Sequence, residues 1–95
     1  MCEWDARKAA VNAMKHGVTF GEAATVFDDP QGLDGPDLAH SGRERRYRRL
    51  GRTASGRLLI VGYTRRRLGD VENIPIITAR PPSRRQRATY TSARD

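Results

Sequence analysis

The sequence predicts an α+β fold, with two helices first, then an antiparallel sheet of about four strands, then a last helix. Residues 5–28 hold two helix-capping patterns with apolar residues at helical spacing, and a third capping pattern begins at Ser83. Residues 58–63 and 74–79 are apolar runs of strand length. With 95 residues, 37% of them hydrophobic, the chain is expected to form a single domain over residues 1–95 with a small core.

The first helix is expected at residues 5–16. Asp5 can act as its N-cap, because a carboxylate accepts the free backbone N–H groups of the first turn. Lys15 and His16 lie in the last turn, where positive charge suits the helix dipole. Gly17 can adopt the left-handed conformation that ends a helix. Small residues recur at spacings of three and four along one face: Ala6, Ala9, Ala10 and Ala13.

The second helix is expected at residues 20–28. Thr19 and Glu22 have the spacing of a capping box, and the run D-D-P that ends at Pro30 stops the helix. An apolar stripe runs along it at positions i, i+3, i+4 and i+7: Phe20, Ala23, Ala24 and Phe27. The corner between the two helices is tight.

Residues 31–42 are rich in Gly, Asp and Pro, which favours a loop or a broken edge strand. Residues 43–52 carry neighbouring arginines, whose repulsion disfavours a helix and favours a strand. Such a strand would place Glu44, Arg46 and Arg48 on one face.

A hairpin turn is expected at residues 53–56, followed by a buried central strand at 58–63. Residues 65–73 are expected to form a charged loop, and residues 74–79 a second apolar strand in which Pro75 takes a position that needs no ladder hydrogen bond. The last helix begins near Ser83, since Ser83 and Gln86 repeat the capping-box spacing.

Charge is distributed unevenly along the chain. Residues 1–40 hold three basic and seven acidic residues, a net charge of −4, whereas residues 41–95 hold fifteen basic and four acidic residues, a net charge of +11. Sixteen of the eighteen basic residues are arginine, whose fork matches phosphate and carboxylate geometry. A polyanionic partner is therefore expected, namely RNA, DNA or an acidic protein; the alternative is a solvated surface without a partner.

Several classes of protein are not expected. No apolar run approaches the roughly 20 residues of a membrane span, and the first residues lack the pattern of a signal peptide. The single cysteine, Cys2, allows neither an internal disulfide nor a multi-cysteine metal site. The sequence thus predicts a cytoplasmic protein with no metal and no cofactor. His40 and Ser41 are residue types of hydrolytic sites, but an orienting partner is not visible, and a surface histidine is favoured.

The string E-W-D-x-x-K-x-x-x-N-x-x-K-H-G-V-x-F-x-x-A-x-x-x-F-D-D-P, over residues 3–30, resembles the opening of the BrnT toxin family. Later landmarks of that family follow in order: H-S-x-x-E-x-R, L-G-R-T-x-S-G-R-L-L-x-V-x-Y-T, I-x-I-I-T-A-R and S-R-R-x-R-x-x-Y. The resemblance covers about residues 3–90.

This resemblance implies a RelE-like fold and a ribonuclease toxin of a type II toxin–antitoxin system. It also implies neutralisation by a BrnA-type antitoxin, which has a ribbon-helix-helix region and represses the operon together with the toxin by binding operator DNA. Metal-independent RNA cleavage needs a base for the 2′-hydroxyl, a proton donor for the leaving oxygen and positive charge around the phosphate.

The resemblance supplies candidates for these roles. Arg46 and Arg80 are the leading candidates for phosphate stabilisation. Glu44 is a candidate base, with a structural salt bridge as the alternative. Tyr63 is a candidate for proton transfer, with core packing as the alternative. Four further residues are expected to bind RNA: Arg48, Arg84, Arg87 and Tyr90.

Three positions depart from the family pattern. The loop after Thr64 is longer than expected, Pro75 replaces a polar or basic residue, and Gln86 stands where a glutamate is usual. If that glutamate were a general base, the activity of this chain would be in doubt. The alternative function is therefore an antitoxin-binding co-repressor without ribonuclease activity. The capping-box pattern assigns Gln86 a structural role, which glutamine fills as well as glutamate does.

Overall fold

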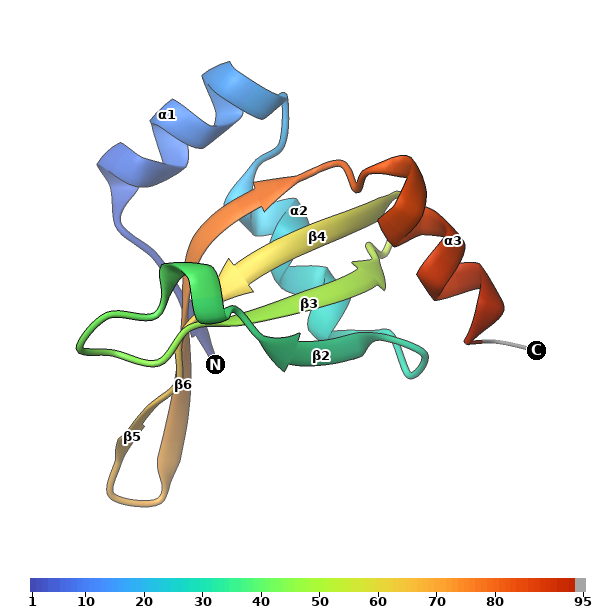
Figure 1. Ribbon diagram of the computed structural model, residues 1–95. Coiled ribbons are helices and arrows are strands. Elements are labelled where there is room, and N and C mark those ends of the chain that lie inside the picture. The colour runs from blue at the N-terminus through green and yellow to red at the C-terminus, as the bar shows by residue number, and fades with distance from the viewer. Residues whose placement is uncertain (94–95) are drawn as a thin grey trace.

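The computed structural model describes residues 1–93, which form three α-helices, two short 3-10 turns and a six-stranded sheet (Figure 1). In chain order the elements are β1 (Cys2–Glu3), α1 (Ala6–His16), α2 (Phe20–Ala24), η1 (Thr25–Asp28), β2 (Leu33–Pro36), η2 (Leu38–His40), β3 (Tyr47–Arg52), β4 (Leu58–Tyr63), β5 (Arg66–Leu68), β6 (Val71–Arg80) and α3 (Arg84–Ser92).

The sheet has the strand order β1-β6-β4-β3-β2, and β5 pairs with the outer part of β6. The neighbours from β2 to β6 are antiparallel, but β1 runs parallel to β6, with Cys2 opposite Ile74. The prediction of about four strands, all antiparallel, is therefore wrong, because the sheet has six strands and is mixed. β1 is too short to leave a sequence pattern, and β5 lies in the segment 65–73 that was predicted as a loop.

The predicted helix at 5–16 is confirmed as α1. The carboxylate of Asp5 accepts the backbone N–H of Lys8 at 3.0 Å, and Gly17 ends the helix with a φ of 67°. The predicted helix at 20–28 divides into α2 and the 3-10 turn η1.

The predicted last helix is confirmed as α3, and its capping box is complete. The Ser83 hydroxyl accepts the backbone N–H of Gln86 at 3.1 Å, and the Gln86 side chain accepts the backbone N–H of Ser83 at 2.9 Å. The segment 31–42 contains β2, which is an edge strand as expected.

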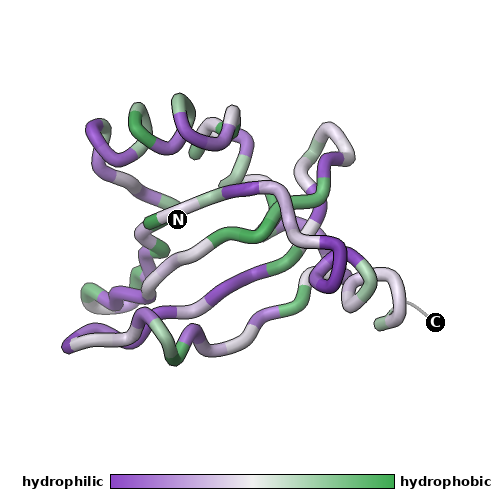
Figure 2. The backbone as a smooth tube through the Cα atoms, turned by 45° about the horizontal axis from the view of Figure 1, so that its top comes forward, coloured by the Kyte–Doolittle hydropathy of each residue, from purple (hydrophilic) through white to green (hydrophobic). Residues whose placement is uncertain are grey.

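The two faces of the sheet carry separate apolar clusters. Toward α2 the cluster consists of Val18, Phe20, Ala23, Val26, Leu59, Val61, Ile76 and Ala79. Toward α3 it consists of Leu50, Leu58, Ile60 and Tyr90. β4 supplies both clusters because alternate residues of a strand point to opposite faces, and it is the hydrophobic centre of the sheet in Figure 2. No helix within residues 1–93 is long and apolar enough to cross a membrane.

Arg49 ties the edge of the sheet to the η1 turn. Its guanidinium donates to the carbonyl of Val26 at 2.8 Å and to the carbonyl of Asp29 at 2.6 Å, and it also pairs with the Asp34 carboxylate. The guanidinium packs so closely on Gly32 that a Cβ there would lie 2.3 Å from a guanidinium nitrogen.

Asp29 is a second junction, although its sequence pattern indicated only the end of a helix. Its carboxylate accepts the backbone N–H of Arg52 at 2.8 Å and the hydroxyl of Tyr90 at 2.8 Å, so it links η1 to β3 and α3. Burial alone would raise the pKa of Asp29, but hydrogen bonds from the Arg52 and Gln31 backbone and from Tyr90 outweigh it and lower that pKa.

Asn12 joins α1 to the last residues of β6. Its amide nitrogen donates to the carbonyls of Ala79 at 2.8 Å and Val18 at 3.1 Å, and its amide oxygen accepts the N–H of Ala79 at 3.0 Å. The side chain is buried. β1 pairs with β6 only at Ile74 and Pro75. At Ala79, the Asn12 side chain makes the backbone hydrogen bonds that a neighbouring strand would otherwise make.

We expect Asn12→Ala to lower the free energy of unfolding by about 2–4 kcal/mol, because it leaves the N–H and C=O of Ala79 buried without these partners. Denaturant unfolding would measure this, with Met14→Ala as the control on the exposed side of the same helix. A loss as small as that of the control would contradict the role given to Asn12.

Candidate active site

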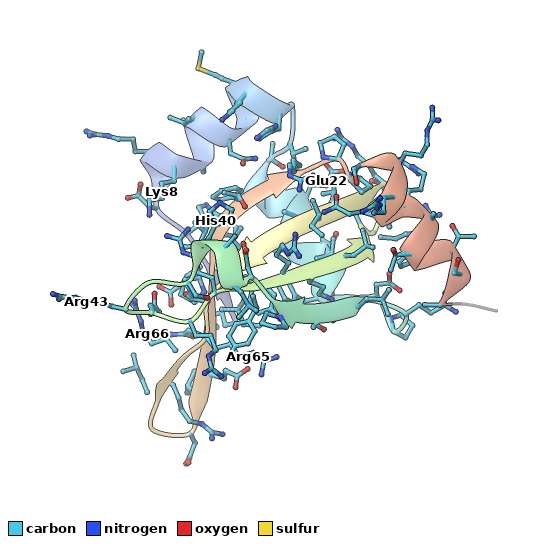
Figure 3. The ribbon with its side chains drawn as sticks, in the orientation of Figure 1. Lys8, Glu22, His40, Arg43, Arg65 and Arg66 are labelled. Carbon is cyan, nitrogen blue, oxygen red and sulfur yellow. The ribbon has the colours of Figure 1, made fainter. Side chains whose placement is uncertain are left out.

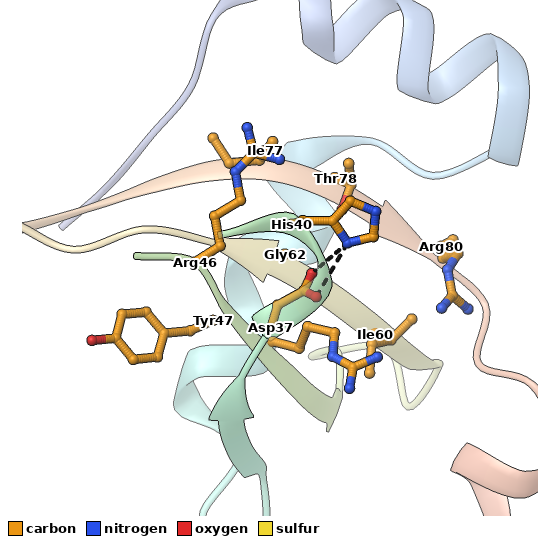
Figure 4. A pocket seen from close by; sticks show the side chains of 10 residues that line it. Asp37, His40, Arg46, Tyr47, Ile60, Gly62, Ile77, Thr78 and Arg80 are labelled. Atoms are coloured by element: carbon orange, nitrogen blue, oxygen red, sulfur yellow. Dashed lines mark hydrogen bonds and ion pairs between the residues drawn. The ribbon is translucent and has the colours of Figure 1, made fainter. Parts of the chain in front are cut away.

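A pocket of about 140 Å³ opens on the face of the sheet that also carries α3 (Figure 4). Its lining comes from η2, from the start of β3, from β4 and from the end of β6: Asp37, His40, Arg46, Tyr47, Arg48, Ile60, Gly62, Ile77, Thr78 and Arg80. These residues span 44 positions of the chain, and the pairing of β3, β4 and β6 brings them together.

Three arginines line this pocket. Arg46 directly precedes β3, Arg48 lies within it, and Arg80 is the last residue of β6. Arg80 is opposite Ile60 in the β4–β6 register, and Arg48 is opposite Gly62 in the β3–β4 register. Three permanent positive charges around one small pocket favour an anion such as a phosphate.

His40 and Asp37 form a side-chain pair at the same pocket. The Nδ1 atom of His40 lies 3.1 Å from both carboxylate oxygens of Asp37. The histidine side chain is 68% exposed, whereas that of Asp37 is only 15% exposed. When Nδ1–H donates to the carboxylate, Nε2 keeps its lone pair and is the basic atom of the ring.

The backbone around this pair is held by hydrogen bonds. The N–H of Asp37 donates to the carbonyl of Arg46 at 2.8 Å, and the Ser41 hydroxyl donates to the carbonyl of Asp37 at 2.8 Å. The same Ser41 oxygen accepts the N–H of Arg46 at 3.1 Å. Ser41 therefore closes the loop between β2 and β3, and the partner of His40 is Asp37 rather than Ser41.

The pair Asp37–His40 is the feature that the sequence analysis missed. The sequence pattern that could have revealed this pair is D-x-x-H, in D-L-A-H. A single 3-10 turn brings two residues with this spacing onto the same side of the chain. The residues lie in a segment rich in Gly and Pro, for which the sequence favoured a loop or edge strand.

Gln86 positions Arg80. The guanidinium of Arg80 donates to the Gln86 side-chain oxygen at 3.2 Å and to the carbonyl of Pro81 at 3.1 Å. That Gln86 oxygen also belongs to the capping box of α3. The start of α3 thus fixes the direction of the Arg80 side chain.

The floor of the pocket depends on Gly62. A Cβ atom there would lie 2.6 Å from the hydroxyl oxygen of Thr78 on the neighbouring strand. The register between β4 and β6 also shifts between Gly62 and Tyr63. A glycine at this irregularity leaves the space in which Thr78 and the arginines border the pocket.

Two predicted catalytic residues lie outside this pocket. Glu44 precedes β3 and forms an ion pair of 3.9 Å with Arg66, in which both side chains are about half exposed. Tyr63 points to the other face of the sheet, where its buried ring stacks on Tyr47 and its hydroxyl donates to Asp34 at 2.6 Å. Their catalytic roles stay predictions.

The residues predicted to bind RNA are divided in the same way. Arg48 lines the pocket, whereas Arg84 and Arg87 are exposed on α3. Tyr90 is buried against Leu50 and Ile60. Among residues 1–93, no three side chains of His, Cys, Asp or Glu gather at a distance that would hold a metal ion.

Comparison with known proteins gives a family and a fold. A family described as the ribonuclease toxin BrnT of type II toxin–antitoxin systems matches residues 4–86. The crystal structure of the Brucella abortus ribonuclease toxin BrnT superposes with a TM-score of 0.63 and 21% sequence identity, over 88% of this chain and 99% of that one. At this identity the likeness shows the α+β fold. No curated protein sequence matches the chain.

The pKa of Tyr63 gives a test of this geometry. Burial and the hydrogen bond to Asp34 raise the pKa of Tyr63 to about 12. An unfolded tyrosine ionises near pH 10, so the folded state loses stability as the pH rises from about 10 toward 12. We expect Tyr63→Phe to reduce this alkaline loss in denaturant titrations between pH 9 and pH 11. An identical pH dependence in both proteins would contradict the burial of this hydroxyl.

Proposed function

This chain belongs to the BrnT family of ribonuclease toxins of type II toxin–antitoxin systems, and on that premise we propose that it cleaves RNA in the pocket of His40 and the three arginines, without a metal ion. The observation that supports the proposal most is the pair Asp37–His40 at the edge of a small pocket lined by Arg46, Arg48 and Arg80.

In the proposed reaction, His40 is the general base. Asp37 accepts the Nδ1–H hydrogen bond, which leaves Nε2 free to take the proton of a ribose 2′-hydroxyl. The 2′-oxygen then attacks the adjacent phosphorus, and the bond from phosphorus to the 5′-oxygen breaks. The leaving 5′-oxygen takes a proton from water, and the hydroxide that remains takes the proton held on Nε2 of His40, which restores the base. The products are a 2′,3′-cyclic phosphate and a 5′-hydroxyl end.

The arginines would stabilise the transition state. Negative charge grows on the phosphate oxygens as the fifth bond to phosphorus forms, and fixed guanidinium donors hold that charge without reorganisation. Arg80 suits this role because Gln86 and Pro81 already fix its direction. Arg46 is tied to the same loop as Asp37 through its backbone. Asp37 would orient His40, and its single negative charge leaves the pocket positive because three arginines line it.

The proposal extends to the partners. A toxin of a type II toxin–antitoxin system has an antitoxin partner. We propose that this partner is a BrnA-type antitoxin with a ribbon-helix-helix region, through which the complex would bind operator DNA. The net charge of +11 in residues 41–95 suits an acidic antitoxin segment. The RelE-like character of the fold, which the family resemblance implies, and the cytoplasmic location, which the composition of the sequence predicts, belong to the same proposal.

Cleavage of a defined RNA by the purified protein, with and without a chelator, tests the metal-independent mechanism. We expect equal cleavage in both, with 2′,3′-cyclic phosphate ends by mass spectrometry, because the attacking oxygen is the neighbouring 2′-hydroxyl. Cleavage abolished by the chelator and restored by a divalent ion would contradict the mechanism. No cleavage at all, together with retained antitoxin and operator binding, would favour the inactive co-repressor.

Arg80 tests the assignment of the phosphate site. We expect Arg80→Ala to slow cleavage by a factor of about 100 or more, the usual scale for losing one such donor. Arg80→Lys keeps the charge but loses the fork, and should also be slower than the unchanged protein. Arg67→Ala, on the exposed strand β5, is the control. Undiminished cleavage by Arg80→Ala, at an unchanged melting temperature, would remove Arg80 from the site.

A further inference from the structure

A second hollow, of about 330 Å³, lies between α1 and β6 and adjoins the proposed active site. We call it the α1 groove; it is lined mainly by Arg7, Lys8, Val11, Lys15, His16 and Ile77. Ile77 and Thr78 line both the groove and the active-site pocket. In Figure 4 these two residues lie on β6 between α1 and the loop of His40 and Arg46.

The charges of the α1 groove are not typical of its part of the sequence. Residues 1–40 have a net charge of −4 and contain only three basic residues other than histidine. All three, Arg7, Lys8 and Lys15, line this groove. Helix α1 itself has no acidic residue. The fold therefore collects the positive charge of an acidic segment on the one side of α1 that faces β6.

These three cations have no carboxylate partner in the described part of the chain. Each is exposed, and within residues 1–93 none forms an ion pair with a carboxylate. Other arginines differ, since Arg49 and Arg57 are tied to Asp34 and Glu22. The groove cations are thus available to an anionic ligand.

The spacing along α1 suits an extended chain of phosphates rather than a single anion. Lys8 and Lys15 are seven residues apart, which places them about 10 Å apart along the helix axis. Between them Val11 is 58% exposed and faces Ile77 across the groove. Alternating cationic and apolar contacts match a single nucleic-acid strand, which offers phosphates on one side and sugar and base faces on the other.

We propose that the α1 groove binds the stretch of single-stranded RNA adjacent to the phosphate that is cleaved. This inference rests on the proposed function, because the path of the RNA is drawn toward the proposed active site. The RNA would pass from the groove over Ile77 and Thr78 into that site. Lys8 lies in this path on α1, and His40 lies on η2 (Figure 3). Asn12 keeps α1 at its place beside β6 and so keeps the groove in line with the pocket.

The test uses a single-stranded RNA in which every 2′-hydroxyl is methylated, so that the strand can bind but cannot be cleaved through a 2′-oxygen. Fluorescence anisotropy gives its Kd between 50 and 200 mM salt. We expect the double variant Arg7→Ala/Lys15→Ala to bind roughly tenfold more weakly at 50 mM salt. The slope of log affinity against log salt should become shallower by about 1.4, or 0.7 for each lost phosphate contact.

The matched control, Arg67→Ala/Arg85→Ala, loses the same charge at exposed positions outside the groove and the pocket. We expect it to change affinity less than twofold. Equal losses in both double variants would overturn the groove and leave only a general effect of net charge. An unchanged salt slope in the groove variant would also overturn it.

The groove and the proposed function can fail separately. Retained binding in the groove variant, alongside normal cleavage, would refute the groove while keeping the ribonuclease. A groove-dependent Kd in a protein that cleaves no RNA would keep the groove and refute the active site. If the groove variant instead loses affinity for poly-glutamate while RNA binding is unchanged, the α1 groove is a surface for an acidic protein segment, and the RNA proposal is wrong.

Discussion

The hydrogen bonds between Asn12 and Ala79 are the constraint on which the functional side of this protein depends. β1 pairs only with Ile74 and Pro75, so within residues 1–93 no strand lies beside Ala79 on that edge of β6. A single buried amide supplies the donor and the acceptor that a strand would have supplied. Because Arg80 is the next residue, these bonds hold the end of β6 from which the Arg80 side chain projects, and they hold α1 beside β6.

Residues that stabilise the fold and residues of the proposed site lie on opposite faces of the sheet, because successive side chains of a strand point to opposite faces. On one face, β3 and β4 direct Arg49, Val61 and Tyr63 toward α2 and η1, where Arg49 is used entirely for structure. On the other face, Arg48 and Ile60 border the pocket. Neighbouring arginines in one strand therefore have opposite tasks. Composition alone shows a basic segment and cannot say which of its charges are free to meet a ligand.

The fold was predictable where local rules decide it. The capping residues predicted where α1 and α3 begin, and the apolar run of β4 identified the central strand. β1 and β5 were missed because two or three residues carry no periodicity, and their pairing with β6 is a tertiary effect. In the site, Arg46 and Arg80 were found through family landmarks. The partner of His40 was missed, because Asp37 reaches it only through a 3-10 turn that hydrogen bonds to Arg46 and Ser41 stabilise.

The central claim is that the imidazole of His40 removes the proton that starts RNA cleavage, and chemical rescue tests it most directly. His40→Ala removes the ring from an exposed position, so the fold and the three arginines should remain. The account predicts that this variant cleaves RNA slowly and that added imidazole restores cleavage in proportion to its concentration, while Arg80→Ala gains nothing from imidazole. Full activity of His40→Ala, or a loss that imidazole never restores, would contradict the account.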